Sequence, residues 1–205
     1  MIDMHYDLLT VIYRAHLEKD YTYVAKWLKN YNSKNVTGLV ANLYFMSRKE
    51  MDEELGKNYY NDNKTVTEMF GKSIELLEKV MPNGIDVVYA IEGCDYIEDI
   101  NELETLYEMG LRSICLVWNE PNKYGSGNRG NYGLTSEGIT FIRKAIELGI
   151  AIDLSHANEQ TFYDIINVIK EYRLNGYNPI VFASHSNSRT LCDIPRNLTD
   201  EQLHA

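Results

Sequence analysis

Short apolar runs alternate with longer amphipathic segments along this chain of 205 residues. Each run is continuous and rich in Val, Ile, Leu or Tyr, which predicts a strand buried on both faces, as in a parallel sheet covered by helices. The predicted strands are Met1–Tyr6, Gly38–Phe45, Asp86–Ile91, Ser113–Val117, Ile150–Leu154 and Ile180–Ala183.

The segments between these runs place apolar residues at helical spacing. Asn63 and Thr135 are expected to cap the helices that follow them. The polar stretch Lys49–Asn63 is interpreted as a loop or short insert. The predicted helices are Lys64–Val80, Asn101–Met109, Ser136–Leu148, Glu159–Leu174 and Thr199–His204.

Strand and helix therefore alternate six times, and no G-x-G-x-x-G turn follows the first strand. This order favours an α/β fold of the (β/α)8 TIM-barrel type over a nucleotide-binding sheet. Such a barrel usually takes about 250 residues. We therefore expect residues 1–205 to form a single barrel domain, truncated after about six βα units, with its C-terminal part missing.

Twenty basic and thirty acidic residues give a net charge of −10, which disfavours nucleic acid and anionic membrane surfaces as partners. The three cysteines show no C-x-x-C spacing, which fits a reducing compartment. There is no basic-then-apolar leader and no apolar run near the roughly 20 residues that span a bilayer. We expect a soluble, cytoplasmic protein with no membrane partner.

Histidines and carboxylates gather where the predicted strands end. His5, His156 and His185 lie at or just beyond the C-terminal ends of three strands, and Asp7 and Glu92 lie at equivalent points. Because these ends emerge on one face of a parallel barrel, the five side chains are expected to share one rim as metal ligands.

The first strand carries the pattern Asp3-x-His5-x-Asp7. Residues i and i+2 of an extended segment face the same way, so His5 and Asp7 can hold one cation, with Asp3 one step deeper on the same side. The alternative is that His5 is a hydrogen-bonded structural residue and Asp7 caps the following helix.

Glu92 follows five apolar residues and precedes a glycine. A carboxylate there would lose hydration, and such groups are normally paired or bound to metal. Its two oxygens can bridge two ions; the alternative is a glutamate turned into solvent. His156 and His185 each follow a serine, and two such sites facing the H-x-D pattern favour ligands over structural histidines.

Other residues near these ligands are considered for supporting roles. Asp153 is expected to orient a ligand histidine. Ser155 and Ser184 are not in a G-x-S-x-G elbow, so a nucleophilic serine is not expected. Arg196 can hold an oxyanion or polarise a carbonyl, or else it is a surface charge. The glycine-rich stretch 125–133 is interpreted as a mobile loop over the rim.

Six motifs in order resemble the membrane dipeptidases, also called renal dipeptidases, which are two-zinc peptidases on a (β/α)8 barrel. The motifs are Ile2-Asp3-x-His5-x-Asp7, Ile91-Glu92-Gly93, Gly133-Leu134-Thr135, Ile152-Asp153-Leu154-Ser155-His156, Ser184-His185-Ser186 and Arg196-Asn197-Leu198.

The resemblance implies a ligand set and a reaction. His5 and Asp7 would bind the first zinc, His156 and His185 the second, and Glu92 would bridge both. Arg196 would contact the substrate and steady the tetrahedral intermediate. A bridging hydroxide activated by the two ions would then hydrolyse the peptide bond of a dipeptide.

Two departures from the family pattern stand out. Trp118 stands where animal members have a histidine that contacts the intermediate, which leaves that role open, with Asn119 as the candidate. The last two strands of the barrel, with an aspartate and a tyrosine of the substrate pocket, would lie beyond Ala205. The chain would then be either a fragment of a longer gene product or a shortened form, and the open sheet edge of a shortened form would need another chain, such as a second copy in a homo-oligomer, to cover it.

Two other functions stay open at this point. One keeps the two metals and changes the substrate, giving a barrel amidohydrolase or phosphoesterase that acts on another small molecule. The other is an inactive truncated scaffold or interaction module.

Overall fold

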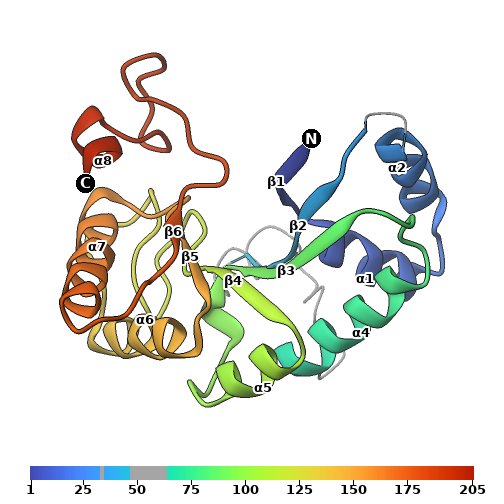
Figure 1. The fold of residues 1–205 in the computed structure, drawn as a ribbon, viewed down its shortest axis with the longest axis horizontal. Coiled ribbons are helices and arrows are strands. Elements are labelled where there is room, and N and C mark those ends of the chain that lie inside the picture. Colours follow the sequence, from blue (N-terminus) through green and yellow to red (C-terminus); the bar gives the residue numbers. More distant parts are fainter. Residues whose placement is uncertain (33–34, 47–63) are drawn as a thin grey trace.

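The computed structural model describes residues 1–32, 35–46 and 64–205, and shows six parallel strands in one sheet (Figure 1). The strands follow one another in the sheet in chain order, so every connection is a crossover to the next neighbour. They are β1 (Ile2–Tyr6), β2 (Gly38–Tyr44), β3 (Asp86–Glu92), β4 (Leu111–Cys115), β5 (Ala151–Asp153) and β6 (Val181–Phe182).

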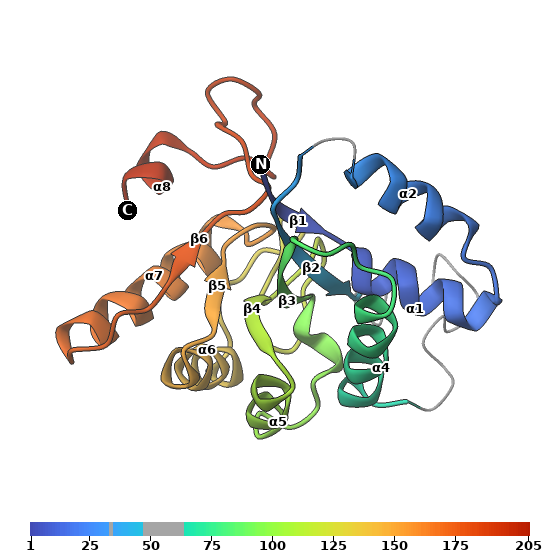
Figure 2. The same cartoon turned by 45° about the vertical axis from the view of Figure 1, so that its right-hand side comes forward.

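The sheet is curled, and the helices of the crossovers lie on its outer side (Figures 1 and 2). This arrangement is a half-barrel of the TIM type and confirms the predicted α/β fold with six βα units. The helices are α1 (Leu8–Glu18), α2 (Thr22–Asn32), α4 (Val66–Glu78), α5 (Glu102–Glu108), α6 (Ser136–Leu148), α7 (Glu159–Leu174) and α8 (Asp200–His204), with a 3-10 turn, η1, at Cys94–Tyr96.

Local sequence explains where the helices begin. Thr135 and Asn158 accept hydrogen bonds from the first turns of α6 and α7. Helix α4 begins after Thr65, which forms a capping box with Glu68. Asn63, the predicted cap of α4, lies outside the described residues, as does the stretch 49–63 interpreted as an insert.

Two differences from the predicted elements have a physical reason. The fourth strand begins at Leu111, two residues before the predicted start, because Gly110 (φ +108) ends the preceding helix and Leu111 pairs directly with Tyr89 of β3. The first crossover contains two helices, α1 and α2. The spacing between the first two strands does not show whether one helix or two connect them. Leu8 and Ile12 of α1 are fully buried at helical spacing.

The apolar core contains side chains from the strands and from the helices that cover them. Ile12 of α1, Phe70 of α4 and Phe141 of α6 are all fully buried. Burying one such side chain stabilises the fold by about 1.5–3 kcal/mol. Four strands also carry a buried polar residue, which an apolar core does not require: Asn42, Glu92, Ser113 and Asp153.

The glycine-rich segment between β4 and α6 is a loop, as predicted, and part of it is packed against the fold, while its mobility stays a prediction. Tyr124 and Ser126 of this segment are buried, and the Tyr124 hydroxyl donates to the carbonyl of Ile97 at 2.6 Å. A side chain at Gly127 would overlap the carbonyl of Trp118. The glycines therefore permit close approach of two backbones.

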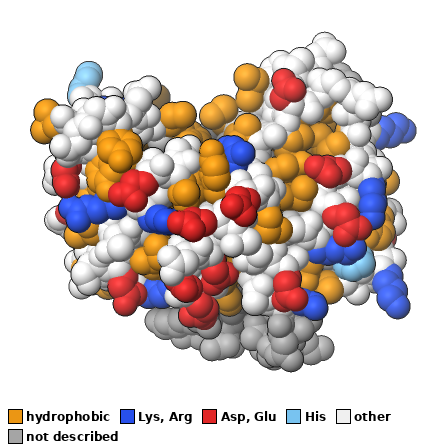
Figure 3. All heavy atoms as spheres, turned by 60° about the horizontal axis from the view of Figure 1, so that its bottom comes forward, with side chains coloured by type: hydrophobic (Ala, Val, Ile, Leu, Met, Phe, Trp, Pro, Cys, Tyr) orange, Lys and Arg blue, Asp and Glu red, His pale blue; other side chains and the backbone are white. Residues whose placement is uncertain are grey.

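Acidic and basic side chains are interspersed over the face of the molecule shown in Figure 3. Some of these charges form ion pairs between neighbouring helices, such as Arg143 with Glu171 at 3.0 Å and Lys144 with Glu104. Exposed pairs of this type contribute about 0–1 kcal/mol each. Of the helices in the described ranges, none combines the length and apolar character needed to cross a membrane.

Candidate metal centre

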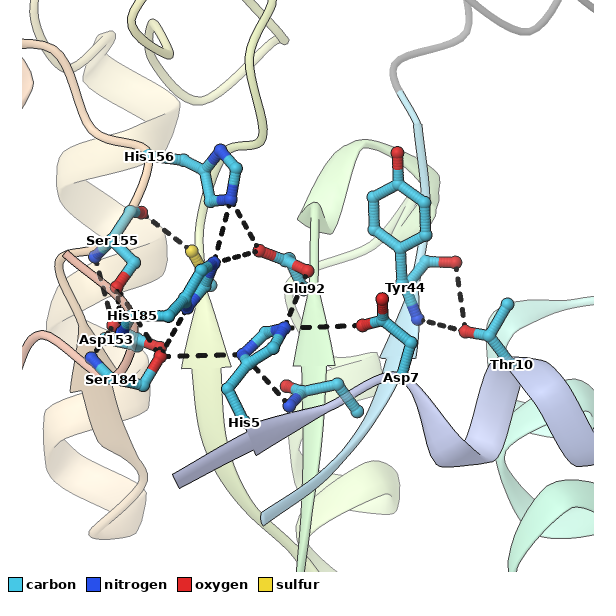
Figure 4. Close-up of polar contacts among 12 residues, drawn as sticks. His5, Asp7, Thr10, Tyr44, Glu92, Asp153, Ser155, His156, Ser184 and His185 are labelled. Atoms are coloured by element: carbon cyan, nitrogen blue, oxygen red, sulfur yellow. Dashed lines mark hydrogen bonds and ion pairs between the residues drawn. The ribbon is translucent and has the colours of Figure 1, made fainter. Parts of the chain in front are cut away.

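Three imidazoles and two carboxylates converge at the C-terminal ends of the strands (Figure 4). His5 lies in β1 and Glu92 is the last residue of β3. His156 and His185 each lie three residues after the last residue of β5 and β6. One ligand atom each from His5, Glu92 and His185 lies within 4.8 Å of the others. The shared rim expected from the sequence is therefore present.

The two oxygens of Glu92 face different histidines. Oε2 lies 3.2 Å from Nε2 of His5. Oε1 lies 3.0 Å from Nε2 of His156 and 3.4 Å from Nε2 of His185. Glu92 is 2% exposed, so its carboxylate is almost completely removed from water. A carboxylate divided in this way can serve two cations, one at each oxygen.

Asp7 lies at the N-cap position of α1, but its side chain makes no cap hydrogen bond. Its Oδ1 instead lies 3.3 Å from Nε2 of His5. This geometry matches the paired arrangement expected of an H-x-D pattern and differs from the helix-cap alternative.

Two of these carboxylate oxygens test whether a metal fits the site. Within the described part of the chain, Oδ1 of Asp7 and Oε1 of Glu92 are buried and accept no hydrogen bond of regular geometry, and the ion-pair contacts with the imidazoles are what they have instead. A buried, unsatisfied acceptor costs about 1–3 kcal/mol, and more when it is charged. Imidazole nitrogens and carboxylate oxygens are the ligands that zinc takes, so the donor set fits a divalent metal.

Each imidazole turns its Nε2 toward the carboxylates and has a polar side chain behind its Nδ1. These partners are the Asn42 amide at 3.1 Å from His5, Oδ1 of Asn119 at 3.1 Å from His156 and Oγ of Ser184 at 2.6 Å from His185. A hydrogen bond behind one ring nitrogen orients the ring and decides which nitrogen is free to bind a metal.

Three predicted supporting residues make specific contacts around the ligands. Asn119, predicted to bind substrate, lies behind His156. Asp3 accepts the Tyr31 hydroxyl at 2.5 Å and the backbone amide of His5 at 3.2 Å. Asp153 reaches the histidines through Ser184, whose hydroxyl donates to Oδ2 of Asp153.

Arg196 lies beside the rim in the loop that precedes α8. Its Nη1 donates to Oγ of Ser186, next to His185, at 2.8 Å. Asn197 holds this loop together, because it accepts the amide of Asn187 and donates to the carbonyl of Cys192.

Two aromatic rings lie near the ligand cluster. The Trp118 ring lies 5.9 Å from the ring of His156 and 5.2 Å from that of Tyr44, centroid to centroid. Trp118 thus lies beside the ligand cluster, at the position where the resemblance placed a histidine.

The charges of the site are strongly coupled. Burial disfavours the charged form of His5, but the carboxylates of Asp7 and Glu92 outweigh it and raise the pKa of His5 to about 10. Burial opposes ionisation of Glu92, yet the imidazoles around it hold its pKa well below the usual value. Burial lowers the pKa of His156, and it also lowers the pKa of Arg196. In the metal-free site the two carboxylates therefore favour the protonated form of His5, and the imidazoles favour the ionised form of Glu92.

The backbone of His156 has φ +67, in the left-handed region. This conformation costs a residue other than glycine about 1–2 kcal/mol. Strain of this kind gathers at functional sites, where surrounding contacts hold it in place.

Sequence reasoning missed two residues of the cluster. Asn42 is the one polar residue in the run Gly38–Tyr44 apart from the terminal tyrosine, and it is 3% exposed. A lone amide in a buried strand is the signal that could have identified it. From the sequence, Ser184 is weighed only for a nucleophilic role, and its place directly before His185 is the signal that could have assigned it to that imidazole.

The fold and the sequence have relatives among known proteins. The model of the membrane dipeptidase family, peptidase family M19, matches residues 46–205, a range that excludes β1 with His5 and Asp7. A metallo peptidase from Rhodobacter sphaeroides, solved with a phosphinate mimic of the dipeptide L-Ala-D-Ala, has a similar fold. The TM-score is 0.71 at 18% identity, over 98% of this chain and 69% of that chain.

Curated relatives match over shorter segments. An uncharacterized protein of Acinetobacter calcoaceticus is 38% identical over 128 residues, which is 58% of this chain and 38% of that protein. An uncharacterized dipeptidase of Schizosaccharomyces pombe is 30% identical over 126 residues, 58% of this chain and 28% of that protein. The chain thus spans well under half the length of these relatives. Because the family model matches most of the chain, this protein belongs to the membrane dipeptidase family, peptidase family M19.

Proposed function

We propose that this chain is the metal-binding part of a dipeptidase that holds two zinc ions and hydrolyses the peptide bond of dipeptides. The observation that carries the proposal is the convergence of His5, Asp7, His156 and His185 on the two oxygens of Glu92. Family membership supports a peptidase over the amidohydrolase and phosphoesterase alternatives.

The two oxygens of the Glu92 carboxylate face different side chains, and this supports the assignment of each ligand to one of the two ions. His5 and Asp7 lie on the Oε2 side and would hold one ion. His156 and His185 lie on the Oε1 side and would hold the other. Glu92 would then bridge the two ions, which would offset the cost of burying its charge.

Two bound ions would act as Lewis acids on the peptide carbonyl and lower the pKa of water near them. The residues of the chain supply positioning and charge. The buried Glu92 keeps the two groups of histidines together, and Asn42 and Asn119 hold two of the rings in place. Arg196, steadied by Ser186, would donate to the oxyanion that develops on the carbonyl.

Dipeptides are the substrate class that we propose for this site. The solved relative from Rhodobacter sphaeroides was liganded with a mimic of L-Ala-D-Ala, which supports dipeptides as the substrate class. Trp118 and Tyr44 would form an apolar wall beside one side chain of such a substrate. A single barrel domain, a cytoplasmic location and a homo-oligomer stay predictions.

Metal analysis combined with a substrate panel tests the proposal. The purified chain is loaded with Zn²⁺, dialysed, and analysed for bound metal, and hydrolysis of a panel of L,L and L,D dipeptides is followed. We expect about two zinc ions per chain and hydrolysis that a chelator abolishes and added Zn²⁺ restores. Zinc binding with hydrolysis of only N-acyl amides or phosphate esters would contradict the peptidase assignment, and a chain that binds no zinc would contradict the whole proposal.

A further inference from the structure

Of the three imidazoles in the cluster, His185 is the least enclosed. Its side chain is 30% accessible, against 12% for His5 and 9% for His156. Neighbouring atoms therefore restrain its ring less than the other two rings. A specific hydrogen bond is the remaining means of fixing its orientation.

The partner of His185 in that hydrogen bond is the hydroxyl of Ser184, which has a single hydrogen. Oγ of Ser184 lies 2.6 Å from Nδ1 of His185 and also contacts Oδ2 of Asp153. A carboxylate accepts hydrogen bonds and donates none, so the Ser184 hydrogen points to Asp153. Only lone pairs of Oγ then face His185, and its Nδ1 must carry the ring hydrogen.

The direction of this chain of hydrogen bonds is set by Asp153. Its Oδ1 accepts the backbone amides of Ser155 at 3.0 Å and Ser184 at 3.1 Å, which leaves Oδ2 for the Ser184 hydroxyl. Asp153 is 5% exposed, so water has little access to compete for these positions. The backbone of His185 is held as well, because its amide donates to Oγ of Ser155 at 3.2 Å.

We propose that Ser184, oriented by Asp153, is the positioning residue that keeps His185 in the Nδ1–H tautomer with Nε2 free to bind a metal. The Nε2 atom so freed is the one that lies 3.4 Å from Oε1 of Glu92 and 2.9 Å from Nε2 of His156. This inference deepens the proposed function, since it rests on His185 being a metal ligand there.

The same geometry predicts an unusual effect of one conservative substitution. In Asp153→Asn the amide oxygen must stay at the Oδ1 position to accept two backbone amides, which places the NH2 group against Ser184. The Ser184 hydrogen then turns to Nδ1 of His185 and imposes the Nε2–H tautomer, which cannot bind a metal through Nε2. Removing the Ser184 hydroxyl from this variant should relieve the effect.

The test compares zinc affinity, measured by competition with a chromophoric chelator, across a set of variants of the full chain. Loss of such a supporting hydrogen bond typically weakens metal affinity about 10–100-fold, which is the effect expected for Ser184→Ala and for Asp153→Asn. Ser184→Thr should bind like the wild type. The double variant Asp153→Asn with Ser184→Ala should bind more tightly than Asp153→Asn alone. Ser73→Ala is the matched control, since Ser73 is buried in α4 and donates to the carbonyl of Met69.

Nitrogen-15 NMR of the imidazoles reads the tautomer directly and does not depend on activity. We expect His185 to carry its hydrogen on Nδ1 in the wild type, both zinc-loaded and metal-free at alkaline pH. Wild-type zinc affinity in Ser184→Ala, or an unprotonated Nδ1 in the wild type, would overturn the inference while leaving the proposed function intact. A protein that binds zinc through this network but cleaves no dipeptide would overturn the proposed function alone.

Discussion

Oγ of Ser184 lies 3.5 Å from Nδ1 of His5, although the two residues are 179 positions apart in the sequence. His5 belongs to the first strand of the sheet and Ser184 follows the last one. The rims of β1 and β6 can meet in this way only because the sheet curls (Figures 1 and 4). The ligand cluster is therefore a consequence of barrel curvature, and variants can probe its parts separately.

Glu92→Gln should abolish tight zinc binding. The substitution keeps the shape of the side chain and removes the charge shared by three imidazoles. Loss of a supporting residue costs about 10–100-fold in metal affinity, so loss of the central ligand should cost at least about 100-fold. Glu120→Gln, which alters a carboxylate paired with exposed Arg129, is the control. Unchanged zinc affinity in Glu92→Gln would contradict a bridging role.

Arg196→Ala should impair turnover while zinc affinity stays close to that of the wild type. Removing one donor to a developing oxyanion typically lowers kcat about 10²–10³-fold. Steady-state kinetics on the best dipeptide and zinc competition assays separate the two effects. Exposed Arg173 on α7, replaced by Ala, serves as the control. A fall in zinc affinity equal to the fall in kcat would instead assign Arg196 to the structure of the metal centre.

The stability of the metal-free protein should fall as the pH rises above about 6.5. The pKa of His5 is raised to about 10 in the folded state, so the folded protein retains a proton that the unfolded chain loses near 6.5. The stabilisation from His5 is thus complete below about 6.5 and is lost by about pH 10. Urea unfolding with a chelator present, at several pH values, measures it. His5→Asn should show a much flatter alkaline dependence.

The stability of the metal-free protein should also fall as the pH is lowered below about 6.5. The pKa of Glu92 is lowered in the folded state, so its contribution is present above its unfolded value near 4.5 and is lost as the pH falls below it. The lowered pKa of His156 acts in the same direction below about 6.5, because the unfolded chain takes up that proton first. The same urea series extended to low pH checks this, with a smaller acid loss expected in Glu92→Gln.

Gly93→Ala should destabilise the fold and displace Glu92. Gly93 has φ +81, and a Cβ there would overlap the carbonyl oxygen of Phe45. The left-handed conformation alone costs about 1–2 kcal/mol for alanine. Gly149→Ala is a matched control, since Gly149 has φ +78 and open space around its Cβ position. Thermal unfolding should show the larger loss for Gly93→Ala, and equal losses would show that the overlap is relieved at no cost.

Much of the architecture follows from local sequence. The run Asp86–Ile91 could be assigned to a strand because every side chain from Val87 to Ile91 is apolar or aromatic, and helix α6 follows from Thr135 as cap and Gly149 as terminator. Such signals depend on neighbours within a few residues. The start of β4 was missed by two residues, because pairing with Tyr89 sets it.

The sequence by itself determined which residue types stand at the ends of the parallel strands, and so which side chains could serve as ligands. It could not determine that Asn42 and Ser184 lie behind the Nδ1 atoms of His5 and His185, or that Asp7 leaves its helix uncapped. Those contacts depend on the curvature of the sheet and on the orientation of each strand within it. Both are set by the packing of the entire domain. Tertiary structure alone decides them, because hydrogen bonds form between atoms a few ångströms apart in space, however distant the residues are along the chain.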